Sequence, residues 1–250
     1  MKICNNKVIV FDLDETIGHF EQVSMFLNGI QNIVKPYISD KYIFKLLDIW
    51  PNIFRYKIFE IFKLIKKAKI KNNSIKVVIY TNNMGPRYWT LLLKKYIENK
   101  LKFKLFDSVI TAYRPQEKTN FRTTHEKTHS DLVRSLKYKN CKFIFFDDVY
   151  HHYMKHKDIK YVKLHPYKFS ISFTKMIDDY LKSKHNKLIY GDDIVPFKEI
   201  MLKFLNSDKE KYYIKNTSSK INIQEYKKSH HEVKKFLNIT KKNRKHTRKN

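Results

Sequence analysis

Glycine and proline are scarce in this sequence, which has four glycines and six prolines among its 250 residues. Collagen-like, glycine-rich linker and proline-rich architectures depend on these residues and are therefore excluded. Wholesale disorder is excluded as well, because hydrophobic residues make up 42% of the chain and aromatic residues 15%. The length is that of one folded domain, with or without an appendage.

Cysteine is also rare: Cys4 and Cys141 are the only two and lie far apart in the sequence. This pattern is typical neither of a disulfide framework nor of a cysteine metal site. We therefore expect no disulfide partner and a reducing, intracellular compartment, either cytoplasmic or nuclear. We expect no signal peptide, because the N-terminus lacks an apolar run followed by a small-residue cleavage site. We expect no membrane span, because no stretch approaches about 18 uncharged apolar residues.

Acidic residues are outnumbered by basic ones. The 52 lysines and arginines against 24 acidic residues give a formal net charge of +28, which suits a nucleic acid or another anionic partner. Only seven of these cations are arginine, whose planar fork pairs well with phosphate oxygens. Lysine is abundant together with isoleucine and asparagine, and all three have A/T-rich codons. An AT-biased genome, such as that of a large DNA virus or a protist, explains the lysine excess equally well.

Short apolar runs typical of buried parallel strands recur along the chain. They lie at residues 7–11, 75–80 and 142–146, with weaker examples at 106–110 and 159–164. Helical apolar periods lie at residues 53–70, 86–99, 126–137, 171–184, 195–205 and 225–237. Strands that alternate with helices predict an α/β fold, a Rossmann-like parallel sheet with helices on both faces.

Two segments depart from this alternation. Within a main domain at residues 1–185, residues 18–52 mix apolar and polar side chains and are predicted to form a small insertion over the edge of the sheet. Residues 186–240 are predicted to form a helical, basic C-terminal extension, in which the polar segment 207–224 is a loop. The tail Lys241–Asn250 carries six cations and no acid, which indicates either a contact to nucleic acid or a solvated, disordered end.

Acidic and hydroxyl side chains follow three of the predicted strands. They are Asp12 and Asp14 after residues 7–11, Thr81 after 75–80, and Asp147 and Asp148 after 142–146. Ligands of open parallel sheets bind beyond the carboxyl ends of the strands, so these side chains should converge on one crevice.

The pair Asp12 and Asp14 has the spacing of a two-carboxylate catalyst. Residues two apart can face the same side as the chain leaves a strand. One carboxylate can then attack phosphorus while its neighbour transfers the proton of the leaving group. Two adjacent carboxylates repel each other unless a cation lies between them, so a divalent metal is implied.

The segment VIVFDLDET, residues 8–16, resembles motif one (D-x-D-x-T) of the haloacid dehalogenase (HAD) superfamily. With Glu15 at the fourth position of the motif, the segment resembles the branch of FCP/SCP-type, NLI-interacting-factor-like phosphatases. These phosphatases act on the C-terminal domain of RNA polymerase II. The resemblance covers about residues 5–185 and decreases in specificity after motif one. It implies a Mg²⁺-dependent phosphomonoester hydrolase that works through an aspartyl-phosphate, and in particular a protein serine/threonine phosphatase with a phosphorylated protein or peptide as its substrate.

The resemblance also assigns roles to residues. Asp12 would be the nucleophile and Asp14 the general acid and base. Asp12, Asp14, Asp147 and Asp148 would hold Mg²⁺, although the FCP/SCP branch often has Asp-Asn where this chain has Asp147-Asp148.

The phosphoryl group would be bound by residues from two further motifs. Thr81 would hydrogen-bond it, and Asn82 could add its backbone N–H. Lys127 would neutralise its charge as the motif-three lysine, with Lys118 as the alternative.

Other functions stay open at this point. The basic charge suits a HAD phosphatase that acts on nucleic-acid 3′ ends or nucleotides. A non-catalytic HAD-fold binding or scaffold protein is a third alternative, disfavoured because the motif residues are all present. Histidines cluster at residues 125–129 and 151–156, but no cysteine or acidic pair accompanies them at a known metal-site spacing, so surface histidines are the favoured interpretation.

Overall fold

The computed structural model describes residues 2–3, 7–34, 38–116, 121–186, 193–207 and 214–239. Five strands form an all-parallel sheet in the order β4-β3-β2-β6-β7. Their bounds are β2 (Lys7–Phe11), β3 (Lys76–Tyr80), β4 (Ser108–Ile110), β6 (Lys142–Asp147) and β7 (Ile159–Lys163). Each strand therefore forms where an apolar run predicts one.

The central strand β2 is buried on both sides. Val10 lies opposite Val78 of β3 and Phe145 of β6. All three of these side chains are fully buried. A strand that is covered on both faces has no solvated side, which explains why its sequence is a continuous apolar run and not an alternating one.

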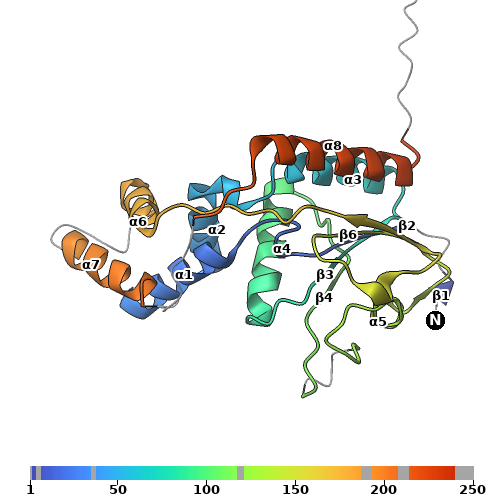
Figure 1. The fold of residues 1–250 in the computed structure, drawn as a ribbon, viewed down its shortest axis with the longest axis horizontal. Coiled ribbons are helices and arrows are strands. Elements are labelled where there is room, and N and C mark those ends of the chain that lie inside the picture. The colour runs from blue at the N-terminus through green and yellow to red at the C-terminus, as the bar shows by residue number, and fades with distance from the viewer. Residues whose placement is uncertain are drawn as a thin grey trace, which may run out of the picture.

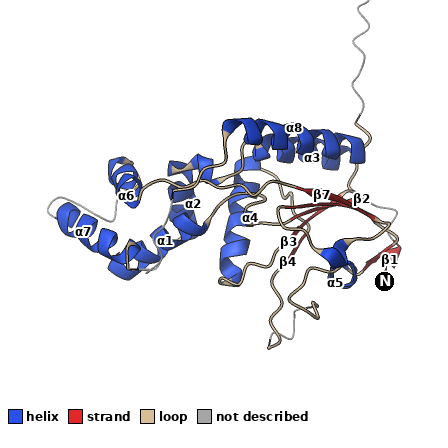
Figure 2. Cartoon of the chain, viewed as in Figure 1, coloured by secondary structure: helices blue, strands red, loops and turns tan. Residues whose placement is uncertain are grey.

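Some helices lie against the sheet, and others form a group to the left of it (Figures 1 and 2). Their bounds are α1 (Glu21–Val34), α2 (Asp40–Ile49), α3 (Ile58–Lys71), α4 (Arg87–Leu101), α5 (His129–Leu136), α6 (Phe173–Lys182), α7 (Ile194–Leu205) and α8 (Ser219–Phe236). Two 3₁₀ turns lie at η1 (Pro51–Ile53) and η2 (His152–Met154). Within the described ranges, none of the helices combines the length and the apolar character needed to cross a bilayer.

Both faces of the sheet carry a buried cluster. On one face Ile9 and Phe11 join the large cluster that includes residues of α1 to α4 and α6 to α8. On the other face Val8 and Val10 pack with Leu132 of α5. The predicted α/β class, with a parallel sheet and helices on both faces, is confirmed.

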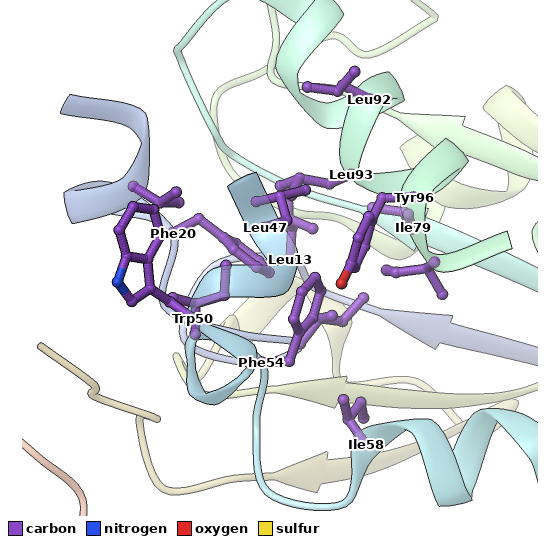
Figure 3. Close-up of a cluster of buried hydrophobic side chains, with 14 of the residues drawn as sticks. Leu13, Phe20, Leu47, Trp50, Phe54, Ile58, Ile79, Leu92, Leu93 and Tyr96 are labelled. Atoms are coloured by element: carbon purple, nitrogen blue, oxygen red, sulfur yellow. The ribbon is translucent and has the colours of Figure 1, made fainter. Parts of the chain in front are cut away.

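Residues 18–52, the predicted insertion, contain the two helices α1 and α2. Leu47 of α2 and the following Trp50 lie in the same apolar cluster as Leu13, Phe54 and Tyr96 (Figure 3). The predicted insertion is therefore helical, and its apolar residues extend the core beside the motif-one loop.

The C-terminal helices also pack on the rest of the chain. Helix α7 contacts α1 and α6, and α8 lies along α3 (Figure 1). Helix α8 begins at Ser219 after a cap in which the Ser218 side chain accepts from the backbone N–H of Ile221, so the predicted loop ends earlier than expected. The domain boundaries stay predictions, and the tail 241–250 lies outside the described residues.

Cys141 corrects the expectation that the chain has no disulfide, because this residue is disulfide-bonded. A short parallel pairing explains how distant segments meet here. The strand β1 (Lys2–Ile3) pairs with β5 (Tyr138–Lys139), which ends just before Cys141. Separation in the sequence was a poor guide to separation in space, and the cysteine-based argument for a reducing compartment is lost.

Candidate active site

The carboxyl ends of β2, β3 and β6 meet at one edge of the sheet. The strand order reverses between β2 and β6, and such a switch point opens a ligand-binding crevice in parallel sheets. Asp12 follows β2, Thr81 follows β3 and Asp147 ends β6. Together with Asp14 and Lys127 they line a cavity of about 390 Å³, which we call the central pocket.

Lys127 bridges two of the carboxylates in this pocket. Its Nζ donates to Oδ1 of Asp12 at 2.5 Å and to Oδ2 of Asp147 at 2.7 Å. The residue directly precedes Thr128, which caps α5, and its side chain is 2% exposed. An ammonium group is buried at low cost only when it is paired, and both partners are present here. The alternative lysine, Lys118, lies outside the described residues.

Burial and neighbouring charges act together on these groups. Burial lowers the pKa of Lys127, but the carboxylates of Asp12 and Asp147 outweigh it and hold that pKa above its usual value. Burial raises the pKa of Asp12 well above its usual range against the opposing effect of Lys127, and burial also raises the pKa of Asp148. At Asp147 hydrogen bonds from His151 and Lys127 outweigh burial and lower the pKa. An added cation would favour the ionised carboxylates.

Three carboxylates form a group that can hold a metal ion. Asp12, Asp147 and Asp148 offer oxygen atoms that all lie within 4.8 Å of one another, and no other such group of acidic, histidine or cysteine ligands occurs in the described part of the chain. When ionised, three carboxylates against one ammonium leave an excess of two negative charges. The donors therefore fit a hard divalent cation, and Mg²⁺ stays a prediction.

Asp14 lies apart from that group. Its Oδ2 accepts a hydrogen bond from Nδ2 of Asn83 at 2.8 Å. Burial raises the pKa of Asp14 despite this bond, so the carboxyl retains its proton to a higher pH than an exposed one. The structure does not bring its side chain into the group of metal-type ligands. Asn83, which positions it, was not singled out in the sequence.

Thr81 and Asn82 also line the central pocket. Thr81 is buried, and its Oγ1 accepts from the backbone N–H of Asn83 at 3.0 Å. The accepting oxygen still carries a hydrogen that can be donated to a bound ligand. Asn82 is exposed at the mouth of the pocket.

Arg122 is a buried residue that the sequence does not reveal. Its Nη1 donates to the carbonyls of Thr81 and Thr111, both at 3.2 Å. Its Nη2 donates to the carbonyls of His125 at 2.8 Å and Glu126 at 3.1 Å. The Arg122 guanidinium thus links the end of β3 to residues 125 and 126, which directly precede Lys127.

Arg55 holds the motif-one loop in a similar way. Its Nε donates to the carbonyl of Thr16 at 2.6 Å, and its Nη2 donates to that of Glu15 at 2.5 Å. Burial lowers its pKa to about 10, so it remains charged at neutral pH. Glu15 has a left-handed φ of 56°, and Thr16 Oγ1 donates to Oδ1 of Asp148 at 2.9 Å. The loop that carries the two catalytic candidates is therefore fixed from outside the pocket.

The histidines divide into two groups. His151 lines the central pocket, with Nε2 3.4 Å from Oδ2 of Asp147. His129 and His156 lie outside it and stack on each other, with ring centroids 3.7 Å apart. Their stack is not part of a metal-type group in the described residues.

Comparison with known proteins adds no assignment: no protein-family model matches the chain, and no curated protein matches it significantly. The function of the site therefore has to be inferred from its own side chains.

Proposed function

We propose that this protein is a divalent-metal-dependent phosphomonoester hydrolase of the HAD type that works through an aspartyl-phosphate. The observation that carries the proposal is the bridge from Lys127 to Asp12 and Asp147 at the switch point of a parallel sheet. The proposed substrate is a phosphoserine or phosphothreonine peptide, as the resemblance of the motif-one segment to FCP/SCP-type phosphatases implies.

Asp12, Asp147 and Asp148 would hold Mg²⁺. When bound, the ion supplies positive charge that neutralises the phosphoryl oxygens and keeps Asp12 ionised. The buried carboxylates and their raised pKa values at Asp12 and Asp148 support a cation at this place.

Two carboxyls carry the covalent steps. Asp12 attacks phosphorus and forms a new P–O bond while the bond to the leaving oxygen breaks. Asp14 gives its proton to that oxygen, and its raised pKa favours the protonated form that this step needs. Asp14 then takes a proton from water, which attacks the aspartyl-phosphate, releases phosphate and restores Asp12.

The remaining residues stabilise and orient the phosphoryl group. Lys127, Thr81 and Asn82 line the central pocket; Lys127 would hold the negative oxygens, and the Thr81 hydroxyl and the Asn82 backbone N–H would donate to them. Asn83 keeps the carboxyl of Asp14 in position through its 2.8 Å hydrogen bond.

The variant Asp12→Asn tests this proposal directly. It should lower Mg²⁺-dependent hydrolysis of p-nitrophenyl phosphate by at least about a thousandfold, because an amide cannot act as the nucleophile. Asp179→Asn, which removes a carboxylate on α6 outside the pocket, should keep the wild-type rate. Removal of the metal with EDTA should stop the reaction, and added Mg²⁺ should restore it. A folded Asp12→Asn protein with the wild-type rate would refute the proposal.

The net charge of +28 favours a second candidate, hydrolysis of phosphate from nucleic-acid 3′ ends or nucleotides by the same residues. A non-catalytic scaffold is the weakest alternative, because it gives no reason for the buried, lysine-bridged carboxylates.

A further inference from the structure

A second cavity adjoins the central pocket on the side of Asp14. We call it the side pocket; it has a volume of about 360 Å³. Asp14, Glu15 and Asn83 line both cavities and form the wall between them. A pocket of this size accommodates a side chain or a small ligand.

The side pocket is where a leaving group would lie. A proton donor must be within hydrogen-bond reach of the oxygen that it protonates, so the leaving oxygen lies against Asp14. Lys127 and the other carboxylates line the central pocket on the near side of Asp14, and a phosphoryl group bound among them would fill it. The remainder of the substrate then extends past Asp14 into the side pocket.

The charge of the side pocket is opposite to that of the molecule. Glu15 and Glu21 line it together with the proton donor Asp14, and no lysine or arginine of the described residues does, although the chain has 52 of them. Lys168 pairs with Glu15 from outside the lining and offsets that carboxylate. Glu21 has no lysine or arginine partner in the described residues, lies 3.7 Å from Nε2 of His19 and is 66% exposed. A cationic group can therefore reach it.

The cavity continues beyond the side pocket. A third cavity of about 230 Å³ shares Ser24, Pro86 and Trp89 with it. Its other lining side chains include Leu27 and Leu92, which are apolar. Three adjacent cavities that share lining residues in sequence fit an extended chain better than a compact small molecule. Among the described residues, no lysine or arginine lines the second or third cavity, which disfavours a polynucleotide, whose next phosphate would lie near Glu15 and Glu21.

We propose that the side pocket selects phosphopeptides with a lysine or arginine next to the phosphorylated residue, and that Glu21 is the main selecting side chain. This selectivity rests on the proposed phosphatase function of the central pocket. In this proposal the acidic side pocket chooses the substrate, and the basic surface of the protein takes no part in that choice.

Three phosphoserine peptides that differ only in the residues flanking phosphoserine test the proposal. With lysine, alanine or glutamate at those positions, kcat/KM at low salt should fall in that order, by about tenfold from lysine to glutamate. High salt should reduce the difference, because exposed charges are screened. Glu21→Gln should reduce the ratio of kcat/KM for the lysine peptide to kcat/KM for the glutamate peptide. Glu21→Lys should reverse this preference. Glu199→Gln, which makes the same charge change on α7, should leave both the ratio and the hydrolysis of p-nitrophenyl phosphate unchanged.

Equal kcat/KM for the three peptides, or a preference for glutamate, would overturn the selectivity. Faster turnover of a 3′-phosphorylated oligonucleotide than of the lysine peptide would overturn it in favour of nucleic acid. Hydrolysis of p-nitrophenyl phosphate separates failure of the selectivity proposal from failure of the phosphatase proposal. If the protein hydrolyses this compound but turns over the three peptides equally well, only the selectivity is wrong. If the wild-type protein with Mg²⁺ hydrolyses neither p-nitrophenyl phosphate nor any of the peptides, the phosphatase proposal itself is wrong.

Discussion

At the scale of single residues, Lys127 is the only lysine or arginine among the described residues that lines the central pocket. Burying its ammonium group is costly without partners, and Asp12 and Asp147 provide two. The sequence offered Lys127 and Lys118 as alternatives among 45 lysines, and only spatial pairing distinguishes one lysine from the others.

Arg122 is expected to act on catalysis through the residues that it positions. Arg122→Lys keeps the charge but loses the fork that reaches four carbonyls, so Thr81 and Lys127 should shift relative to Asp12. We expect kcat for p-nitrophenyl phosphate to fall by about 10- to 100-fold, with a smaller change in KM. Steady-state kinetics with Mg²⁺, together with circular dichroism to verify folding, measures this effect.

Arg134→Lys is the matched control, because Arg134 is 48% exposed on α5 and pairs with the buried Asp131 of the same helix through one nitrogen at 3.2 Å. It should keep the wild-type kcat. Equal losses in the two variants, or an unchanged kcat in Arg122→Lys, would show that Arg122 does not position the site.

Residues that follow a strand were predictable, and residues that position them were not. Asp12 and Asp147 come directly after apolar runs, so a local pattern marks them. Arg122 binds backbone carbonyls, which every residue has, so nothing in the sequence indicates its partners. Asn83 could have been found from its place beside Thr81, but its bond to Asp14 spans 69 positions.

At the scale of elements, the start of α8 shows why surface helices are hard to predict. Residues 219–224 are mostly polar, yet they are helical because Ser218 caps the helix. One stripe of the helix packs on α3, where the Tyr226 hydroxyl donates to Oε2 of Glu60 at 2.6 Å. A surface helix needs only a narrow apolar stripe, so a short stretch of it can contain mostly polar residues and resemble a loop in the sequence.

Gly18 should be essential to the motif-one loop. A Cβ at this position would clash with the carbonyl oxygen of Ile53 and with the ring of Phe20. The carbonyl is itself fixed by the backbone N–H of His19 at 2.7 Å, so it cannot move away freely. Gly18→Ala should therefore lower the free energy of unfolding by about 1–3 kcal/mol, as measured by urea denaturation.

Gly29→Ala is the control for this prediction. Its Cβ would meet the thioether of Met201 and the ring of Phe204, which are side chains and not a fixed backbone carbonyl, and alanine favours the α1 helix over glycine. Its free energy of unfolding should therefore fall less than that of Gly18→Ala. An equal loss in both variants would argue against a special role of Gly18.

The stack of His129 on His156 should make stability depend on pH. Burial, and next the charge of His156, lower the pKa of folded His129 below its usual value near 6.5. The unfolded chain then binds more protons than the folded one between the lowered pKa and about 6.5, so stability is lost as pH falls through that window. His129→Gln removes this contribution.

Melting temperatures at pH 7.5 and 5.5 without added metal test this expectation. The difference between the two temperatures should be smaller for His129→Gln than for the wild type. His231→Gln on α8, an exposed histidine, should keep the wild-type difference. The same difference in His129→Gln and in the wild type would contradict the prediction.

At the scale of the whole molecule, the positive charge and the proposed chemistry are separated. Helices α3 and α8 lie side by side (Figure 1), and their exposed residues include Lys67, Lys227 and Lys235. Within the described part of the chain, Lys127 is the one lysine or arginine that lines the central pocket or the side pocket. The surface charge should therefore affect the stability of the whole molecule, whereas the lining of the two pockets is not basic.

That surplus should destabilise the folded state by self-repulsion, because folding brings like charges closer together. The screening length falls from about 30 Å at 0.01 M salt to about 8 Å at 0.15 M, which is shorter than most distances between charges on a domain of this size. The melting temperature should rise over this range, by about 2–4 °C for each kcal/mol of repulsion that is relieved. Sodium chloride and sodium acetate at equal ionic strength should act alike if screening is the cause. A melting temperature that stays constant or falls would mean that the ion pairs of the folded state already offset the net charge of +28.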